Sequence, residues 1–132
     1  MNINNNITKL DLKYLKNKCW EYLPNLNLNK LKELNLSGNN ISDISFLEKV
    51  KFEKLEKLNL SKNNISNYNI LKNVNFKELK ELNLSFNNIS DISFLEKVKF
   101  EKLEILNLSG NKISDINILG KVNFKKLMNY MK

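Results

Sequence analysis

Apolar residues recur along this chain with a fixed period of 24 residues, without insertions or deletions. The clearest copy reads Leu55-x-x-Leu58-x-Leu60-x-x-Asn63-x-Ile65. A period of this size predicts that each copy forms one coil of a solenoid and contacts only its neighbours. One coil holds too few apolar residues to offset the entropy lost on ordering its backbone. We therefore expect stability to come from stacking of successive coils.

Each coil combines two kinds of spacing. Residues from about Glu33 to Leu36 alternate between polar and apolar, which predicts a short strand that pairs in parallel with its equivalent one coil away. Small residues follow and should turn the chain. In the returning half, the apolar residues from Ile44 to Val50 have a spacing nearer that of a helix. We expect one or two turns of α- or 3₁₀-helix there, ending near Val50.

Polar residues at fixed positions predict how the turns are held. Ser45 and Glu48 fit a capping box, in which both side chains satisfy backbone donors at a helix start. The aspartate before this segment, Asp43 in the first clear copy, should also cap the turn. A column of asparagines follows each strand, and its amides should point inward to satisfy backbone groups of the turn. This interior asparagine column consists of Asn39, Asn63, Asn87 and Asn111.

The register extends beyond the four clear copies. Residues 7–30 keep it, but Leu15 takes the place of the column asparagine and Trp20 takes the place of Ile44. We interpret 1–30 as an N-terminal segment with a degenerate capping coil and 31–126 as four repeats. Residues 127–132 would then be the truncated start of a further coil. Residues 31–56 and 79–104 are identical except for Gly38 against Phe86, which indicates duplication of a two-coil unit.

The chain resembles the leucine-rich repeat superfamily, and its pattern resembles the SDS22-like subclass. The pattern is matched in the first clear repeat by Leu31, Leu34, Leu36, Asn39, Ile41, Ile44, Leu47 and Val50. Each coil departs from it by two extra residues, such as Lys51-Phe52. The resemblance implies a right-handed α/β solenoid with a parallel sheet on its concave face and short helical or 3₁₀ turns on its convex face. It also implies protein binding on the concave face.

Composition narrows the functional classes. The net charge is +8, but all 22 basic residues are lysines that alternate with glutamates. The basic surface predicts at most weak attraction to phosphates or anionic lipids, and specific nucleic-acid reading lacks its best side chain, arginine. The sequence contains no histidine and no glycine-rich phosphate loop, and Cys19 is the only cysteine. These observations predict a protein that is not an enzyme and binds neither metal nor cofactor.

The location is predicted from sequons and from the cysteine. No apolar run is long enough to span a membrane, and the single Cys19 fits a reducing compartment. Several asparagines precede x-Ser or x-Thr, and glycans on Asn59 and Asn83 would cover the sheet. We therefore expect a cytoplasmic protein, although a bacterial origin or a virus-infected cytoplasm would remove the objection to glycosylation equally well.

The candidate binding residues are those that face outward or break the repeat. Two columns vary most, and we expect both on the outer side of the strands, with Phe86 and Ile105 as spatial neighbours that form a hot spot. The first column is Lys9, Glu33, Lys57, Glu81 and Ile105, and the second is Tyr14, Gly38, Lys62, Phe86 and Gly110. Drift after duplication would explain Phe86 equally well, and a solvated polar sheet would explain the asparagines. The predicted partner-binding residues are Phe86, Ile105, Lys62, Tyr14, Asn59 and Asn83. The alternative function is a structural or truncated array that associates end to end with further copies.

Overall fold

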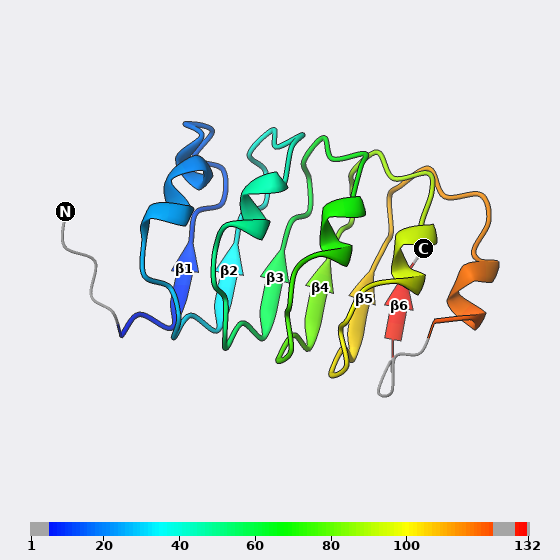
Figure 1. Ribbon diagram of the computed structural model, residues 1–132. Helices are drawn as coiled ribbons and strands as arrows, with labels where there is room; N and C mark the ends of the chain where they lie inside the picture. Colours follow the sequence, from blue (N-terminus) through cyan, green and yellow to red (C-terminus); the bar gives the residue numbers. More distant parts are fainter. Residues whose placement is uncertain (1–5, 123–128, 132) are drawn as a thin grey trace.

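A computed structural model describes residues 6–122 and the backbone of residues 129–131 (Figure 1). One parallel sheet contains a strand from every coil, and the order of the strands follows the sequence. Leu34 lies opposite Leu58, and Leu58 lies opposite Leu82, so the register never slips. This confirms one coil per repeat. The strands are β1 (Lys9–Asp11), β2 (Glu33–Asn35), β3 (Lys57–Asn59), β4 (Glu81–Asn83), β5 (Ile105–Asn107) and β6 (Asn129–Met131).

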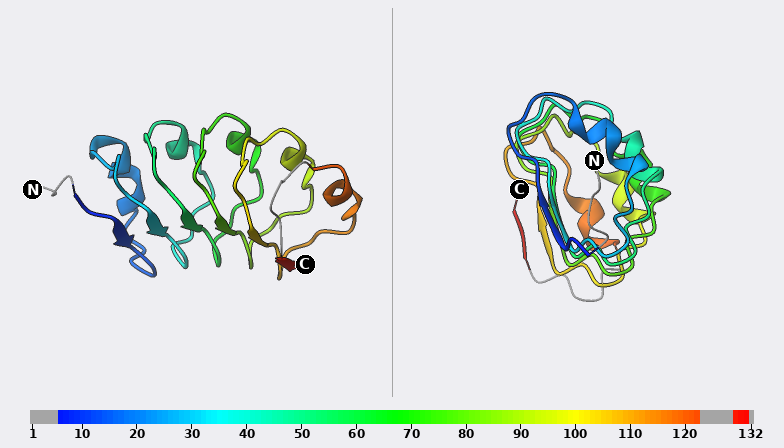
Figure 2. Two further views of the ribbon diagram at one scale, coloured as in Figure 1. Left: turned by 90° about the horizontal axis from the view of Figure 1, so that it is seen from below. Right: turned by 90° about the vertical axis from the view of Figure 1, so that its left-hand side faces the viewer.

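Short 3₁₀ segments cover the side of the solenoid opposite the sheet. Figure 2 shows the sheet on the inner side of a gentle arc and the 3₁₀ segments on its outer side. The predicted convex turns are therefore confirmed, with the segment of the second coil ending two residues before Val50. The segments are η1 (Cys19–Asn25), η2 (Ser45–Glu48), η3 (Asn69–Lys72), η4 (Ser93–Glu96) and η5 (Asn117–Gly120).

Aspartate side chains hold the entry to these 3₁₀ segments. The carboxylate Oδ1 of Asp43 accepts a hydrogen bond from the backbone N–H of Ser45 at 2.8 Å, and Asp91 does the same for Ser93. These bonds keep the pKa of both carboxyls below the usual range. The predicted capping role of the aspartates is confirmed. The predicted capping box is wrong, because the N-cap residue of η2 is Ile44, which precedes Ser45 and makes no side-chain capping bond.

The extra pair of residues in each coil adds an aromatic ladder to the core. Phe52, Phe76 and Phe100 are all buried. Their ring centroids lie 6.0 Å apart between the first two and 5.9 Å apart between the last two. The two extra residues of each coil therefore do not loop out into solvent. They supply one more packed side chain per coil, in register with the leucine columns.

The first coil differs from the others as its sequence predicts. Its 3₁₀ segment η1 is seven residues long and contains Pro24. Trp20 is buried within it and belongs to the common core. At the other end, the predicted boundary between residues 126 and 127 lies outside the described residues, although the backbone of β6 pairs with β5.

Tyr68 is the one described core position where a phenol takes the place of an aliphatic side chain. It occupies the column of Ile44 and Ile92, is 2% exposed, and stacks on Phe94 at a centroid distance of 5.6 Å. Its hydroxyl has no hydrogen-bond partner among the described residues. Burial raises the pKa of this phenol above its ordinary value of about 10.

We expect Tyr68→Phe to stabilise the fold by about 1 kcal/mol, because it removes a buried hydroxyl without a partner. The difference should grow at alkaline pH. The folded state keeps Tyr68 neutral while the unfolded state ionises above a pH of about 10, so stability is lost as pH rises through that value. Urea unfolding at pH 7 and pH 10.5 measures both effects. Tyr22→Phe is the matched control, since Tyr22 is 66% exposed, and it should change neither value.

Candidate functional site

The concave sheet carries a shallow groove of about 480 Å³ that crosses the strands from β1 to β5. Two rows of outward-facing side chains line it, one at the beginning and one at the end of the strands. The charged row consists of Lys9, Glu33, Lys57, Glu81 and, as its one apolar member, Ile105. The asparagine row consists of Asp11 in the first coil and then Asn35, Asn59, Asn83 and Asn107.

The charged row neutralises itself. Lys57 lies between Glu33 and Glu81, with its Nζ 3.6 Å from a carboxylate oxygen of each. Lys9 continues the series, with its Nζ 3.6 Å from Glu33. Exposed pairs of this kind add little stability, but their alternating signs leave the groove with almost no net charge. The excess of lysine in the sequence therefore lies elsewhere on the surface.

The row ends in an exposed aliphatic side chain. Ile105 is 38% exposed and stands opposite Glu81 in the strand register. An apolar residue at a position otherwise filled by charged side chains gives the groove one hydrophobic contact point. The structure thus places Ile105, Asn59 and Asn83 in a single groove.

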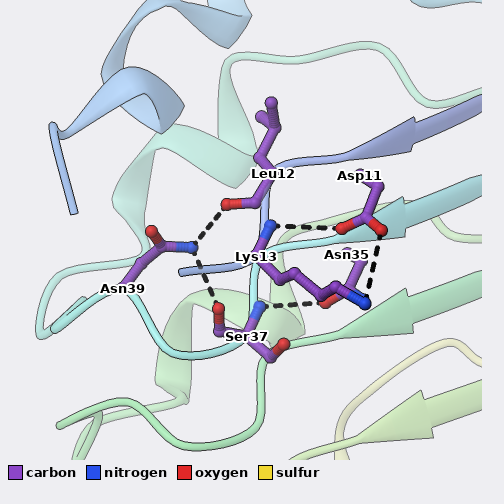
Figure 3. A network of polar contacts seen from close by, with 6 residues as sticks. All are labelled: Asp11, Leu12, Lys13, Asn35, Ser37 and Asn39. Atoms are coloured by element: carbon purple, nitrogen blue, oxygen red, sulfur yellow. Dashed lines mark hydrogen bonds and ion pairs between the residues drawn. The ribbon is translucent and has the colours of Figure 1, made fainter. Parts of the chain in front are cut away.

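The asparagine row is fixed by the turn that follows each strand. In the second coil the Asn35 side-chain Oδ1 accepts a hydrogen bond from the backbone N–H of Ser37 at 3.0 Å (Figure 3). Asn59 and Asn83 make the same bond, and each also accepts from the hydroxyl of the serine two residues later at 2.7 Å. Asp11 takes this role in the first coil with Lys13. Sequence reasoning placed these asparagines outward but missed that their oxygens are engaged.

The second variable column lies in the turn and not on the strand face, which corrects the prediction. We call it the turn row. All its members have positive φ values, from 53° at Phe86 to 69° at the glycines. Glycine adopts this conformation without strain, whereas other residues adopt it at a cost. The row consists of Tyr14, Gly38, Lys62, Phe86 and Gly110.

Large side chains of the turn row cover the glycine of the next coil. A Cβ atom on Gly38 would lie 2.2 Å from the Tyr14 ring, and one on Gly110 would lie 2.5 Å from the Phe86 ring. The Nζ of Lys62 reaches back to the Tyr14 hydroxyl at 3.2 Å. Phe86 is 56% exposed, so it covers the backbone while leaving half of its surface in solvent.

The expected contact between Phe86 and Ile105 is wrong. The backbone N–H of Phe86 bonds to the carbonyl of Ser109, so Phe86 lies level with the turn that follows β5. Ile105 opens β5 and lines the groove, at the other end of the strand. The candidate residues therefore form two groups, one in the groove and one on the turn row beside it.

The interior asparagine column confirms its predicted structural role. The Asn63 Nδ2 donates to the carbonyls of Leu36, Leu60 and Ser61 at 3.0–3.1 Å. Its Oδ1 accepts from the backbone N–H groups of Asn39 and Ile41, both at 2.9 Å. Each column amide thus joins the turn of its own coil to the turn of the preceding coil. Figure 3 shows the corresponding bonds from Asn39 to Leu12 and Ser37.

Within residues 6–122, no three side chains of His, Cys, Asp or Glu lie close enough together to hold a metal ion. Burial raises the pKa of the Cys19 thiol, which favours its protonated and less reactive form. None of the helical segments in the described part of the chain has the length and apolar character needed to span a membrane.

The repeats of this chain match a known protein family. Residues 29–73 and 77–121 match the family model for leucine-rich repeats, two copies per match, and together cover more than half of the chain. The chain belongs to the leucine-rich repeat family. No curated protein shows a significant match to the sequence.

Solved internalins share the architecture of this leucine-rich repeat domain. An internalin C2 from Listeria monocytogenes is 29% identical, with a TM-score of 0.77, over 96% of this chain and 51% of that chain. A second internalin from the same organism is 26% identical, with a TM-score of 0.53, over 83% of this chain and 38% of that chain. The domain therefore spans about half or less of these proteins. The likeness confirms the predicted right-handed α/β solenoid.

Proposed function

We propose that this leucine-rich repeat domain is a non-catalytic interaction module that binds a protein or peptide across its concave face. The observation that carries the proposal is the composition of the groove. The side chains of its two outward rows take no part in the core, the charges of the charged row cancel, and Ile105 stands exposed where the first four coils have lysine or glutamate. A few side chains usually carry most of the binding energy of an interface while the contacts around them exclude water, and Ile105 is the side chain of the groove placed to do so.

The turn row supplies a second contact zone along one side of the groove. Tyr14 and Phe86 expose 53% and 56% of their surface, and Lys62 lies between them in the row. A partner seated on Ile105, Asn59 and Asn83 would reach these side chains only if it also covered the turns. The proposal therefore makes the groove primary and the turn row auxiliary.

We expect Ile105→Lys to weaken partner binding by about 1–4 kcal/mol while leaving the fold intact. Lysine occupies the equivalent position in the third coil, at Lys57, so the strand accepts it, and it removes the apolar contact point. Proximity labelling with the wild-type domain identifies the partner, and titration of the purified pair gives the change in Kd.

Two further variants make this test specific. Phe86→Gly gives the turn row the residue that Gly38 already has, and it should weaken binding less than Ile105→Lys does. Lys51→Ser changes an exposed convex residue and should leave Kd unchanged. A partner that tolerates both Ile105→Lys and Phe86→Gly but loses affinity for Lys51→Ser would place recognition on the convex side and refute the proposal.

Three finer assignments belong to the same proposal. The domain is an SDS22-like repeat lengthened by the aromatic pair of each coil, which the buried ladder from Phe52 to Phe100 supports. It acts without cofactor or metal. It works in the cytoplasm, where the sequons at Asn59 and Asn83 would stay unmodified and the groove open.

The alternative of end-to-end assembly has less support from the structure. The backbone N–H groups of Asn111 and Ile113 have no acceptor among the described residues. In earlier coils the equivalent groups of Asn39 and Ile41, and of Asn87 and Ile89, bond to the asparagine of the following coil. Because β6 already pairs with β5, a second copy would stack its first coil on β6 and would lie one coil away from these two groups. Head-to-tail stacking would therefore leave these donors without the bond that joins the earlier coils.

A further inference from the structure

Beyond Asp11, the asparagine row presents amide N–H donors to the groove. The backbone N–H of Ser61 can bond only to an oxygen, so it fixes which way the Asn59 amide points. The Nδ2 groups of Asn35, Asn59, Asn83 and Asn107 then have no acceptor within the described part of the chain. None of them is among the buried atoms that lack a partner, so solvent reaches them. The groove therefore holds a line of oriented amide donors.

The carboxylates in the rest of the groove are each paired with a lysine, so the groove carries little net charge. The carboxylates of Glu33 and Glu81 are engaged by the lysines beside them, and Asp11 pairs with Lys13 at 3.8 Å. The ligand that fits best is thus an uncharged chain that is rich in acceptors and poor in donors. A proline-rich segment has this chemistry, because proline keeps its carbonyl oxygen but has no backbone N–H.

The spacing of the donors also suits such a segment. Neighbouring strands lie about 4.7–4.9 Å apart, so amides two coils apart are separated by about 9.4–9.8 Å. A polyproline II helix has three residues per turn and repeats about every 9.3 Å. An extended strand repeats about every 6.4–6.8 Å and would lose register with the amides after one contact. Carbonyls at every third residue of a polyproline II helix would meet every second asparagine.

We propose that the concave groove binds an uncharged, proline-rich segment of a protein partner in the polyproline II conformation, with alternate asparagines as donors. This rests on the proposed function and specifies the chemistry of the partner. Two donor pairs have the required separation, Asn35 with Asn83 and Asn59 with Asn107. Ile105, at the β5 end of the charged row, gives a proline ring an apolar surface to contact.

The test uses fluorescently labelled decaproline and a glycine–serine peptide of the same length, with binding followed by fluorescence anisotropy. Two double variants carry the same change in charge on the same face. Asn59→Asp with Asn83→Asp removes one amide from each pair, whereas Asn35→Asp with Asn83→Asp leaves the pair Asn59 and Asn107 intact. Aspartate keeps the oxygen that accepts the serine N–H, so both variants should fold, and their thermal midpoints serve to check this.

Wild type should bind decaproline at least roughly tenfold more tightly than the glycine–serine peptide. The first double variant should lose at least roughly tenfold in affinity for decaproline, and the second should lose much less. Equal losses in the two variants, or equal binding of the two peptides, would overturn the inference. If decaproline does not bind but Ile105→Lys still weakens the native partner, this inference fails and the proposed function stands. If neither effect occurs, both fail.

Discussion

Replacing Asn63 by alanine should destabilise the domain by about 2–4 kcal/mol. The side chain is 6% exposed and makes five hydrogen bonds, two as acceptor and three as donor, to two successive turns. Alanine would leave the N–H groups of Asn39 and Ile41 buried without an acceptor. Denaturant unfolding, followed by circular dichroism, measures the loss directly.

The neighbouring residue provides a matched control for this prediction. Asn64 is exposed, and its side chain makes one contact, to Asn40 at 3.2 Å. Asn64→Ala should change the unfolding free energy by no more than about 0.5 kcal/mol. Asn111→Ala should fall between the two, because Asn111 makes similar bonds but is only partly buried. Equal unfolding midpoints for Asn63→Ala and Asn64→Ala would show that the interior column does not hold the turns.

The fold could be predicted from the sequence because the repeat removes most ambiguity. Any single coil offers only a few alternating residues, which is weak information on a strand of three residues such as β3. Repetition of the same leucine columns requires every coil to adopt the same conformation, and neighbours can then pair only in register. Helix capping was harder to predict, because Asp43 and Ser45 both offer plausible capping groups and only backbone geometry decides between them.

The candidate site was predicted less well, for a physical reason. The variable residues of the turn row were predicted to lie on the outward face of the strands. Their φ values are instead positive, and the side chains of Tyr14 and Phe86 fold over the next coil. Glycine at two of the row's five positions was the available signal, since glycine after a strand commonly marks a left-handed turn. The Tyr14 ring occupies the space that a side chain at Gly38 would need. These two residues belong to different coils, so the pattern within a single repeat could not predict their contact.

Replacing Phe76 by alanine should cost about 3–5 kcal/mol, the range for removing a large buried aromatic side chain. Phe76 is 2% exposed and lies between the rings of Phe52 and Phe100. The substitution would leave a cavity that interrupts the ladder in the middle of the array. Because neighbouring coils stabilise one another, the loss should lower the cooperativity of unfolding as well as its midpoint.

The comparison with Phe86→Ala separates the buried aromatic ladder from a general effect of losing phenylalanine. Phe86 is 56% exposed, so the same substitution there should cost less than about 1 kcal/mol. Phe76→Leu should cost less than Phe76→Ala, since leucine fills part of the cavity. If Phe76→Ala and Phe86→Ala shifted the midpoint equally, the extra residue pair would not be a core element, and the longer period would need another explanation. A large loss confined to Phe76 would show that the two added residues stabilise each coil through their aromatic member.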